Sequence, residues 1–323
     1  MKKVVVTEPI HADGMAILHN RPDLQIESLP DCEPSTLRAA LADAHAVLVR
    51  SAVLDAQILA GAPLLEVVSR HGVGCDNIDV AHLSARGIPV AIAAEANKWS
   101  VTEQVLMMML SLARRTARYD AMTRSGDYRL RGSLPTIELA GRTVLVIGFG
   151  RIGRLVAPLC KAFGMRVVVV DIALDKALAD QMGVESATGF RDWLGKADFV
   201  TLHVPLDEST RHLIGAAELA AMPAHSILIN CARGGVVDEA ALARALHAKA
   251  IAGAGVDVFE LEPPPADHPL FSAPNTVLSP HTAASTVEGL CRMATGSAQN
   301  IVDALEGRLA DGCVFNHAQL HGR

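Results

Sequence analysis

Residues 146–171, with the sequence VIGFGRIGRLVAPLCKAFGMRVVVVD, constrain the fold of this chain more than any other segment. A run of branched apolar residues leads into Gly148, Gly150 and Gly153, and a second apolar run ends on Asp171. Between the two runs, apolar residues recur at helical spacing: Ile152, Leu155, Val156, Leu159, Cys160 and Phe163. This order predicts a parallel strand–helix–strand unit with a glycine turn at the start of its helix.

The three glycines have the G-x-G-x-x-G spacing of a dinucleotide-binding turn. The first glycine permits a tight turn, the second lets backbone amides approach a pyrophosphate, and the third lets the helix pack against the strand. The helix N-terminus directs its partial positive charge at the phosphates, so Arg151 and Ile152 are also predicted to contact the cofactor. Asp171 would bind ribose hydroxyls and repel a 2′-phosphate, which favours NAD over NADP.

The remaining sequence alternates short β-branched runs with Ala- and Leu-rich segments. Five such runs precede residue 98 and six follow Gly141, which predicts an α/β fold with two doubly wound parallel sheets. The capping-box pairs Ser100–Glu103 and Ser285–Glu288 predict two long helices, the second ending near Gly307. Residues 120–138 are polar and predict a long irregular connection.

Composition excludes several classes of function. The net charge is −6 and aromatic residues make up 3%, which argues against nucleic-acid partners. No apolar run is long enough for a signal peptide or a membrane span, so neither is expected. None of the six cysteines forms a C-x-x-C pair, which predicts reduced thiols, a cytoplasmic location and no metal site.

Charged residues follow three of the later predicted strands. Because ligands bind outside the carboxyl ends of parallel strands, Arg233, a glutamate and His281 are candidates for reduction of a carbonyl group. The arginine would bind a carboxylate, the histidine would supply a proton, and the glutamate would orient the imidazole and favour its charged form. Position alone does not decide between Glu260 and Glu262, and it leaves His203 and His268 as other candidate histidines.

The chain resembles the D-isomer-specific 2-hydroxyacid dehydrogenases over nearly its whole length. The segments that carry the resemblance are GFGRIGRLVAPLCKAFGMRVVVVD, ADFVTLHVPLDESTRHLIG, MPAHSILINCARGGVVDEAALARAL, AGAGVDVFELEPP and SPHTAAST. The resemblance implies that Arg233, Glu262 and His281 are the catalytic residues and that Asp257 contacts the nicotinamide carboxamide. It implies further cofactor contacts after two strands, from His203, Val204, Pro205, Cys231 and Ala232. Cys231 departs from the threonine or serine that is common in the family, and its thiol is expected to be oxidisable.

The family also implies a domain plan. An NAD-binding Rossmann domain, residues 99–285, would be inserted into a flavodoxin-like substrate-binding domain made of residues 1–98 and 286–323. A homodimer is expected, with the long helix and the 120–138 connection at its interface. The regulatory serine-binding module of some phosphoglycerate enzymes is expected to be absent.

Residues after two strands of the first domain are predicted to bind the substrate at the same cleft. In the family, the GVG turn that includes Val73 and Gly74 holds the substrate carboxylate through backbone amides. Arg50, Ser51 and Arg70 resemble the residues that phosphoglycerate members direct at a phosphate, and Arg131 would reach across from a partner subunit. The alternative is that these arginines pair with acids or lie in solvent.

The sequence therefore predicts an NAD-dependent oxidoreductase that transfers a hydride between NADH and C2 of a short 2-keto acid. Candidate substrates are the 2-keto forms of 3-phosphoglycerate or glycerate, and glyoxylate. Two alternatives stay open on the same fold. One is an NAD(H)-sensing protein that resembles the C-terminal-binding corepressors, and the other is a formate or phosphite dehydrogenase.

Overall fold

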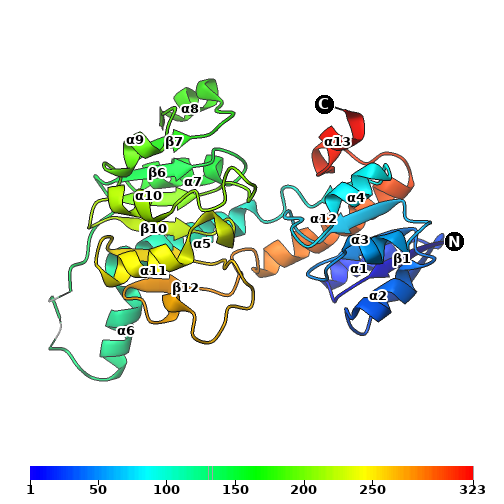
Figure 1. Ribbon diagram of the computed structural model, residues 1–323, viewed down its shortest axis with the longest axis horizontal. Coiled ribbons are helices and arrows are strands. Elements are labelled where there is room, and N and C mark those ends of the chain that lie inside the picture. The colour runs from blue at the N-terminus through cyan, green and yellow to red at the C-terminus, as the bar shows by residue number, and fades with distance from the viewer. Residues whose placement is uncertain (130, 133, 323) are drawn as a thin grey trace. The chain divides into compact units, whose positions relative to one another are not determined.

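The computed structural model describes residues 1–129, 131–132 and 134–322, and it divides the chain into two compact units (Figure 1). The terminal unit comprises Met1–Asn97 and Ser285–Arg323, and the inserted unit comprises Lys98–Ala284. The first and last segments of this chain therefore fold together, and the second unit interrupts the first in sequence.

The terminal unit is built on a five-stranded parallel sheet with the order β2-β1-β3-β4-β5. This is the flavodoxin-like order, as the sequence predicted. Its central strands are buried on both faces, which explains why their sequences are continuous branched apolar runs. The strands are β1 (Lys2–Val6), β2 (Leu24–Ser28), β3 (Ala46–Val49), β4 (Val67–Arg70) and β5 (Val90–Ile92).

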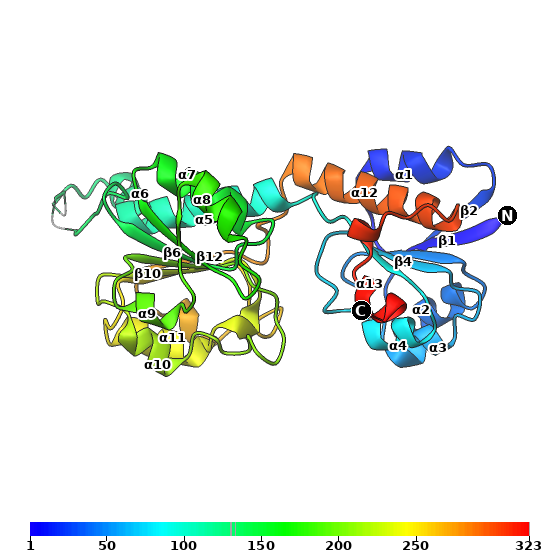
Figure 2. The same ribbon diagram turned by 90° about the horizontal axis from the view of Figure 1, so that it is seen from above.

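Helices cover both faces of this sheet (Figure 2). One face packs against α1 (Ala12–His19) and α12 (Val287–Leu305), and the other against α2 (Pro34–Leu41), α3 (Ala56–Ala60) and α4 (Val80–Ala85). The short η3 (Asp311–Cys313) and α13 (His317–His321) follow α12. Helix α12 begins after Thr286, whose Oγ1 accepts a hydrogen bond from the Gly289 amide at 2.9 Å, so the predicted cap at Ser285 is wrong by one residue.

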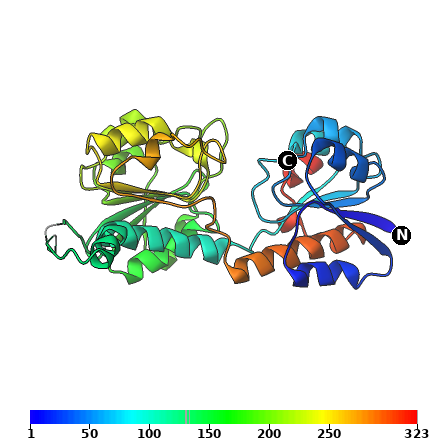
Figure 3. The same cartoon turned by 90° about the horizontal axis from the view of Figure 1, so that it is seen from below.

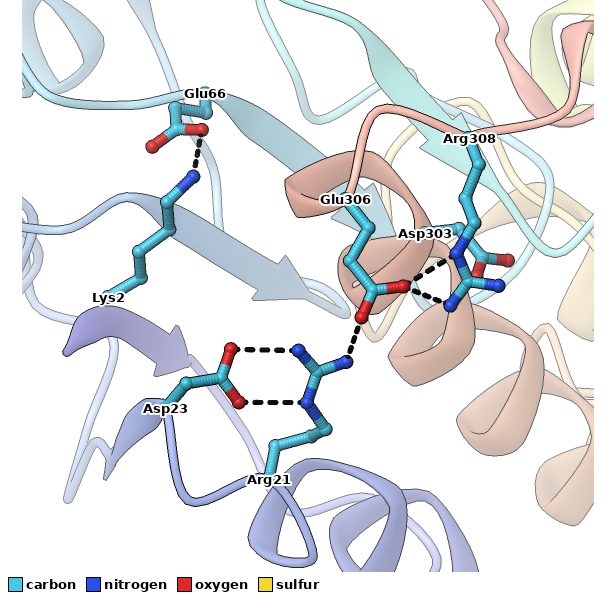
Figure 4. A network of polar contacts seen from close by, with 7 residues as sticks. All are labelled: Lys2, Arg21, Asp23, Glu66, Asp303, Glu306 and Arg308. Carbon is cyan, nitrogen blue, oxygen red and sulfur yellow. Dashed lines mark hydrogen bonds and ion pairs between the residues drawn. The ribbon is translucent and has the colours of Figure 1, made fainter.

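The ends of α1 and α12 are joined by surface ion pairs (Figure 4). The Arg21 guanidinium lies 2.7 Å from Asp23 and 2.5 Å from Glu306, which follows α12 directly. Arg308 pairs with the same glutamate and with Asp303. Exposed pairs of this kind stabilise a fold only slightly, so the apolar contact between α1 and α12 carries most of the association.

The inserted unit is built on a seven-stranded parallel sheet with the order β12-β11-β10-β9-β6-β7-β8. This is the Rossmann order with one added edge strand, and the direction of winding reverses between β6 and β9. The strands are β6 (Thr143–Ile147), β7 (Arg166–Val170), β8 (Glu185–Ser186), β9 (Phe199–Leu202), β10 (Ile227–Asn230), β11 (Gly253–Val256) and β12 (Thr276–Leu278). The two-residue β8 has no apolar run, and sequence analysis missed it.

Helices also cover both faces of the second sheet, as Figures 2 and 3 show. One layer contains α5 (Lys98–Arg114), α7 (Gly153–Ala162) and α8 (Lys176–Met182). The other contains α9 (Arg191–Leu194), α10 (Ala216–Ala221) and α11 (Glu239–His247), with η1 (Gly234–Val236) and η2 (Pro269–Phe271) in the loops. On α7, Val156 and Cys160 are buried as predicted, whereas Phe163 is 43% exposed because the helix has ended before it.

Two further details differ from the sequence-based expectations. Helix α5 begins at Lys98, so Ser100 lies inside the helix rather than at its cap. The predicted irregular connection is partly helical, because α6 (Thr116–Arg124) occupies its first residues after a break at Arg115, which has a positive φ of 54°. Residues 130 and 133 of this connection lie outside the described residues. Among the described residues, no helix has the length and apolar character needed to cross a bilayer.

Candidate active site

The glycine turn joins β6 to α7 at the point where the sheet reverses its winding. Gly148 has a φ of +99°, and a Cβ there would lie 2.4 Å from the His203 carbonyl oxygen. A Cβ at Gly153 would lie 2.1 Å from the Gly148 carbonyl oxygen. At Gly150 a Cβ would meet no described protein atom within 4 Å. Packing thus explains two of the glycines, and the third leaves a space that suits a closely bound phosphate.

Asp171 follows β7 and is held against this turn. One carboxylate oxygen accepts a hydrogen bond from the Phe149 amide at 2.6 Å, and the other accepts one from the Ala173 amide at 2.9 Å. Each oxygen retains capacity to accept another hydrogen bond, because a carboxylate has about four acceptor positions. Arg151 is exposed and Ile152 is half-buried at the start of α7, so the predicted cofactor-binding residues lie together at one edge of the sheet.

The loops after β9 and β10 lie at the same edge. His203 precedes Val204 and Pro205, and its Nε2 lies 3.0 Å from Thr201 Oγ1. Burial lowers the pKa of His203 to about 3, which keeps its imidazole neutral near pH 7. A neutral, hydrogen-bonded imidazole is suited to lining a binding site and does not supply a proton at that pH.

Cys231 and Ala232 follow β10. The Cys231 thiol is buried beside Met108, with its sulfur 3.6 Å from the methionine sulfur. Burial and the nearby Asp257 charge raise its pKa well above the usual value. Because the thiolate is the form that reacts with oxidants, this environment argues against the oxidisable thiol that the sequence suggested.

Arg233 is positioned by its neighbours in sequence. The buried Asn230 donates a hydrogen bond to the Arg233 carbonyl at 2.8 Å and accepts one from the Ala232 amide at 3.0 Å. A Cβ at Gly234 would lie 2.0 Å from the Phe259 carbonyl carbon, so only glycine lets this loop rest directly on the loop after β11. The contact brings the Arg233 guanidinium close enough to Glu262 for its charge to act on that carboxylate.

Glu262 and His281 form a direct pair. His281 Nδ1 lies 2.7 Å from Glu262 Oε2, and Glu262 Oε1 accepts a hydrogen bond from the Phe259 amide at 3.0 Å. Partial burial would raise the pKa of Glu262, but these hydrogen bonds and the charges of His281 and Arg233 lower it. The other candidate, Glu260, lies 2.8 Å from His212 instead. The three residues that the resemblance selected are therefore together in the inserted unit.

Asp257 fixes the loop that carries His281. It is fully buried, and its carboxylate accepts hydrogen bonds from Ser279 Oγ at 2.5 Å and from the Thr282 and Ala283 amides at 2.9 Å each. The Asp257 backbone carbonyl accepts a hydrogen bond from the His281 amide at 2.6 Å. His281 itself has a φ of +52°, a conformation that the surrounding hydrogen bonds must maintain. Contact between Asp257 and a nicotinamide carboxamide stays a prediction.

A second carboxylate–imidazole pair lies beneath the loop that contains Glu262, and sequence analysis did not assign it. Glu239 Oε2 lies 2.8 Å from His268 Nε2, and both side chains are about 90% buried. Glu239 Oε1 accepts a hydrogen bond from the Glu260 amide at 2.7 Å, and burial raises the pKa of Glu239. This pair therefore anchors the loop at Glu260, two residues before Glu262. No local sequence pattern distinguishes Glu239 from a surface glutamate at the start of a helix.

In the terminal unit, Glu8 holds the loop after β3. Its carboxylate accepts hydrogen bonds from the Arg50 amide at 2.9 Å, from the Ser51 amide at 2.7 Å, and from the Ser51 and Thr7 hydroxyls. Burial would raise the pKa of Glu8, but these hydrogen bonds lower it. The Arg50 side chain is exposed, and its guanidinium donates to the Pro9 carbonyl at 3.3 Å. Sequence analysis gave Glu8 no role.

The loop after β4 contains the other predicted substrate-binding residues. The Arg70 guanidinium donates to the carbonyl of His71 in its own loop, so one of its donors is already used. Among the described residues, no group accepts a hydrogen bond from the Val73 or Gly74 amide. Burial and the charges of Arg50 and Arg70 lower the pKa of His71 to about 4, so its ring is neutral near pH 7.

Comparisons with known proteins identify the class of oxidoreductases that shares this fold, two parallel-sheet units of which the second is inserted into the first. Residues 106–283 match the family model described as the NAD binding domain of D-isomer specific 2-hydroxyacid dehydrogenases. The chain belongs to the D-isomer specific 2-hydroxyacid dehydrogenase family. It is thus a member of a family of oxidoreductases whose substrates are small 2-keto and 2-hydroxy acids.

Three relatives illustrate the range of the family. The chain is 39% identical to D-3-phosphoglycerate dehydrogenase of Methanocaldococcus jannaschii over 97% of its own length, but it spans only 59% of that relative. It is 35% identical to glyoxylate reductase of Korarchaeum cryptofilum, covering 97% of this chain and 95% of the relative. The structure of D-lactate dehydrogenase from Aquifex aeolicus, solved with NAD and lactic acid, superposes with a TM-score of 0.86 at 27% identity, covering 99% of this chain and 98% of the other.

Proposed function

We propose that this chain is an NAD-dependent D-2-hydroxyacid dehydrogenase that reduces a short 2-keto acid. The observation that carries the proposal is the 2.7 Å contact between His281 and Glu262, with the Arg233 charge beside them, at the sheet edge that carries the glycine turn. In this assignment the inserted unit binds the dinucleotide and carries the catalytic residues, and the terminal unit contributes further substrate contacts.

The glycine turn and Asp171 are suited to hold NAD. Gly150 leaves room for a pyrophosphate, and the Asp171 carboxylate has acceptor capacity for ribose hydroxyls. A 2′-phosphate would meet the same negative charge, which supports NAD rather than NADP. Bound NADH would supply a hydride to the substrate carbon.

The roles of the side chains follow from their chemistry. Arg233 binds the substrate carboxylate through its planar guanidinium and polarises the neighbouring carbonyl. His281 donates a proton to the carbonyl oxygen as the alcohol forms. Glu262 holds the imidazole through Nδ1, which leaves Nε2 to carry that proton.

The test is reduction of a keto-acid panel by His281→Gln and the wild type, with NADH and NADPH. We expect turnover to fall by about 100-fold or more, since general acid catalysis contributes about 10²–10⁴-fold, while NADH binding is retained. His212→Gln, which changes the histidine paired with Glu260, is the matched control and should keep its activity. Wild-type turnover by His281→Gln would refute the assignment.

The panel also decides the substrate. We propose 3-phosphohydroxypyruvate, because the charges of Arg50 and Arg70 both act on His71, in the loop after β4, and two cations suit a phosphate. The Val73 and Gly74 amides, which have no acceptor among the described residues, would bind the carboxylate that all the candidate substrates share. Arg50→Ala should raise KM for this substrate by about tenfold, because an arginine–phosphate contact is lost, and leave KM for glyoxylate unchanged. Arg38, an exposed residue of α2, supplies the control, and Arg38→Ala should change neither KM. Preference for glyoxylate, hydroxypyruvate or pyruvate over the phosphorylated acid would exclude this substrate.

The alternatives give different results in the same assays. An NAD(H)-sensing protein would bind NADH and reduce none of the panel, and a formate or phosphite dehydrogenase would reduce NAD with those anions instead.

We also propose a homodimer, because no described residue of α6 is buried within the chain and Met107 on α5 is 42% exposed. A monomeric mass by light scattering would exclude the dimer, and with it a role for Arg131 in a partner's site.

A further inference from the structure

Three side chains of different chemistry meet where α1 packs against α12. His11 is the N-cap residue of α1, Asp13 lies in its first turn, and Cys291 lies in the first turns of α12. The Cys291 sulfur lies 3.3 Å from Asp13 Oδ2, and His11 Nδ1 lies 3.6 Å from the same oxygen. One potential ligand atom from each residue lies within 4.8 Å of the other two.

Packing of the two helices fixes this arrangement. Gly14 is next to Asp13, and a Cβ there would lie 2.7 Å from the Ala294 carbonyl carbon. Ala294 is three residues after Cys291, so it lies on the same face of α12. The close approach that Gly14 permits therefore brings the start of α1 within reach of the Cys291 thiol, and the two helices bury a shared apolar cluster.

We propose that His11, Asp13 and Cys291 bind a zinc-class divalent cation. Zinc binds thiolate sulfur at about 2.3 Å and imidazole nitrogen or carboxylate oxygen at about 2.0–2.2 Å, so tetrahedral ligands lie roughly 3.3–3.8 Å apart. The two distances to Asp13 Oδ2 match that spacing before any metal binds. A thiolate and a carboxylate together balance the charge of a divalent ion.

The ligand set also selects the ion and its coordination. Magnesium and calcium prefer six or more oxygen ligands, and this cluster offers a single carboxylate with a sulfur and a nitrogen. Sulfur and imidazole ligands favour zinc and its neighbours in the first transition series. Three protein ligands leave the fourth tetrahedral position to water, and the partial exposure of His11 and Cys291 gives the ion access from solvent.

The binding step is balanced by loss of a proton. Cys291 now donates its S–H to Asp13, so metal binding forms the sulfur–metal bond and releases the thiol proton to solvent. His11 Nδ1 accepts a long 3.3 Å hydrogen bond from the Asp13 amide, so this nitrogen carries a lone pair and not an N–H. Coordination replaces that weak hydrogen bond and links the two helices through the ion.

Cobalt(II) is the probe, since it binds in zinc sites and gives a near-ultraviolet charge-transfer band only when thiolate is a ligand. We expect the full-length reduced protein to bind one cobalt ion with this band and to release it when zinc is added. Cys291→Ser should abolish the band, and zinc affinity should fall by more than about 100-fold, beyond the 10–100-fold typical of changes to outer partners. His11→Gln and Asp13→Asn should each weaken binding.

Matched controls are Cys32→Ser and Cys313→Ser, because these are the other partly exposed cysteines and both lie in the terminal unit. Both should keep the band. Melting temperatures without metal show that each variant is folded, and zinc should raise the melting temperature of the wild type and of these controls but not of Cys291→Ser. Absence of the band at saturating cobalt, or its persistence in Cys291→Ser, would overturn the proposal.

Discussion

The Glu262–His281 pair makes a specific prediction for turnover. Glu262→Gln removes the carboxylate oxygen that lies 2.7 Å from His281 Nδ1, so the imidazole loses the partner that holds it in place. Turnover should fall by about tenfold or more, because misplacing a catalytic group can cost about 100-fold, while the Kd for NADH should stay unchanged. The measurements are kcat for the keto acid and a titration with NADH.

Glu260→Gln is the matched control for this variant, since Glu260 lies in the same loop but contacts His212. It should keep the wild-type turnover. Wild-type turnover by Glu262→Gln would mean that Glu262 does not position His281.

His71 predicts a different pH effect, on stability. Its pKa is about 4 in the folded chain and about 6.5 when unfolded, so between these values the unfolded chain binds a proton that the folded chain does not. Stability should therefore fall as pH decreases from about 6.5 towards 4, by up to about 1.4 kcal/mol per pH unit from this residue. Denaturant unfolding at several pH values should show a smaller fall in His71→Gln.

His19 is exposed at the end of α1 and supplies the comparison. His19→Gln should keep the wild-type fall in unfolding free energy over the same pH range. An equal fall in all three proteins would show that His71 does not couple protonation to folding.

At the scale of the elements, the β6–α7 turn separates two roles of glycine. Gly150→Ala adds a methyl group that meets no described protein atom, so the melting temperature should stay within a few degrees of the wild type. The same methyl group would occupy the space for the pyrophosphate, so the Kd for NADH should rise by about tenfold or more. Gly153→Ala should instead unfold at lower temperature, because its Cβ would collide with the Gly148 carbonyl.

Calorimetry and NADH titration of both variants test this separation. Equal losses of stability in Gly150→Ala and Gly153→Ala would show that both glycines are packing residues. Unchanged NADH affinity in Gly150→Ala would place the pyrophosphate elsewhere.

The sequence predicted the elements where their patterns are continuous. Both parallel sheets follow from buried central strands that are mostly apolar, such as β3 and β6, and the glycine turn follows from its spacing after β6. It missed β8, whose two residues form no pattern. It placed the start of α12 one residue early, because Ser285 and Thr286 are adjacent and both residue types cap helices, and it placed the start of α5 at Ser100 although the helix begins at Lys98.

The site was less predictable than the sheets. Spacing alone could not choose between Glu260 and Glu262, since the choice depends on where the loop after β11 turns, and the resemblance was needed to select one. Glu239 was missed for a related reason, because its carboxylate accepts a hydrogen bond from the Glu260 amide in another loop, and such a contact leaves no mark on the local sequence. Asn230 was missed although its contacts are local, because an asparagine at the end of a strand does not by itself show that it holds the Ala232 amide and the Arg233 carbonyl.

At the scale of the whole molecule, the division into two units predicts separable effects on stability and binding. Gly14→Ala should destabilise the terminal unit by roughly 1–3 kcal/mol, because the new Cβ would press on the Ala294 backbone. All predicted dinucleotide contacts lie in the inserted unit, so the Kd for NADH should not change. Denaturant unfolding and NADH titration measure the two effects.

Gly312→Ala is the control in the terminal unit, since its Cβ would meet no described atom within 4 Å. Its stability and its affinity for NADH should both match the wild type. A weaker affinity for NADH in Gly14→Ala would contradict the assignment of the dinucleotide to the inserted unit.

The insertion also orders the events of synthesis on the ribosome. The five strands of the terminal unit are made first, but α12, which covers one of their faces with α1, is made only after the whole inserted unit. During translation the nascent sheet therefore presents Val4, Val6 and Leu48 without their final cover. That surface stays without its full apolar cover until residues 287–305 leave the exit tunnel.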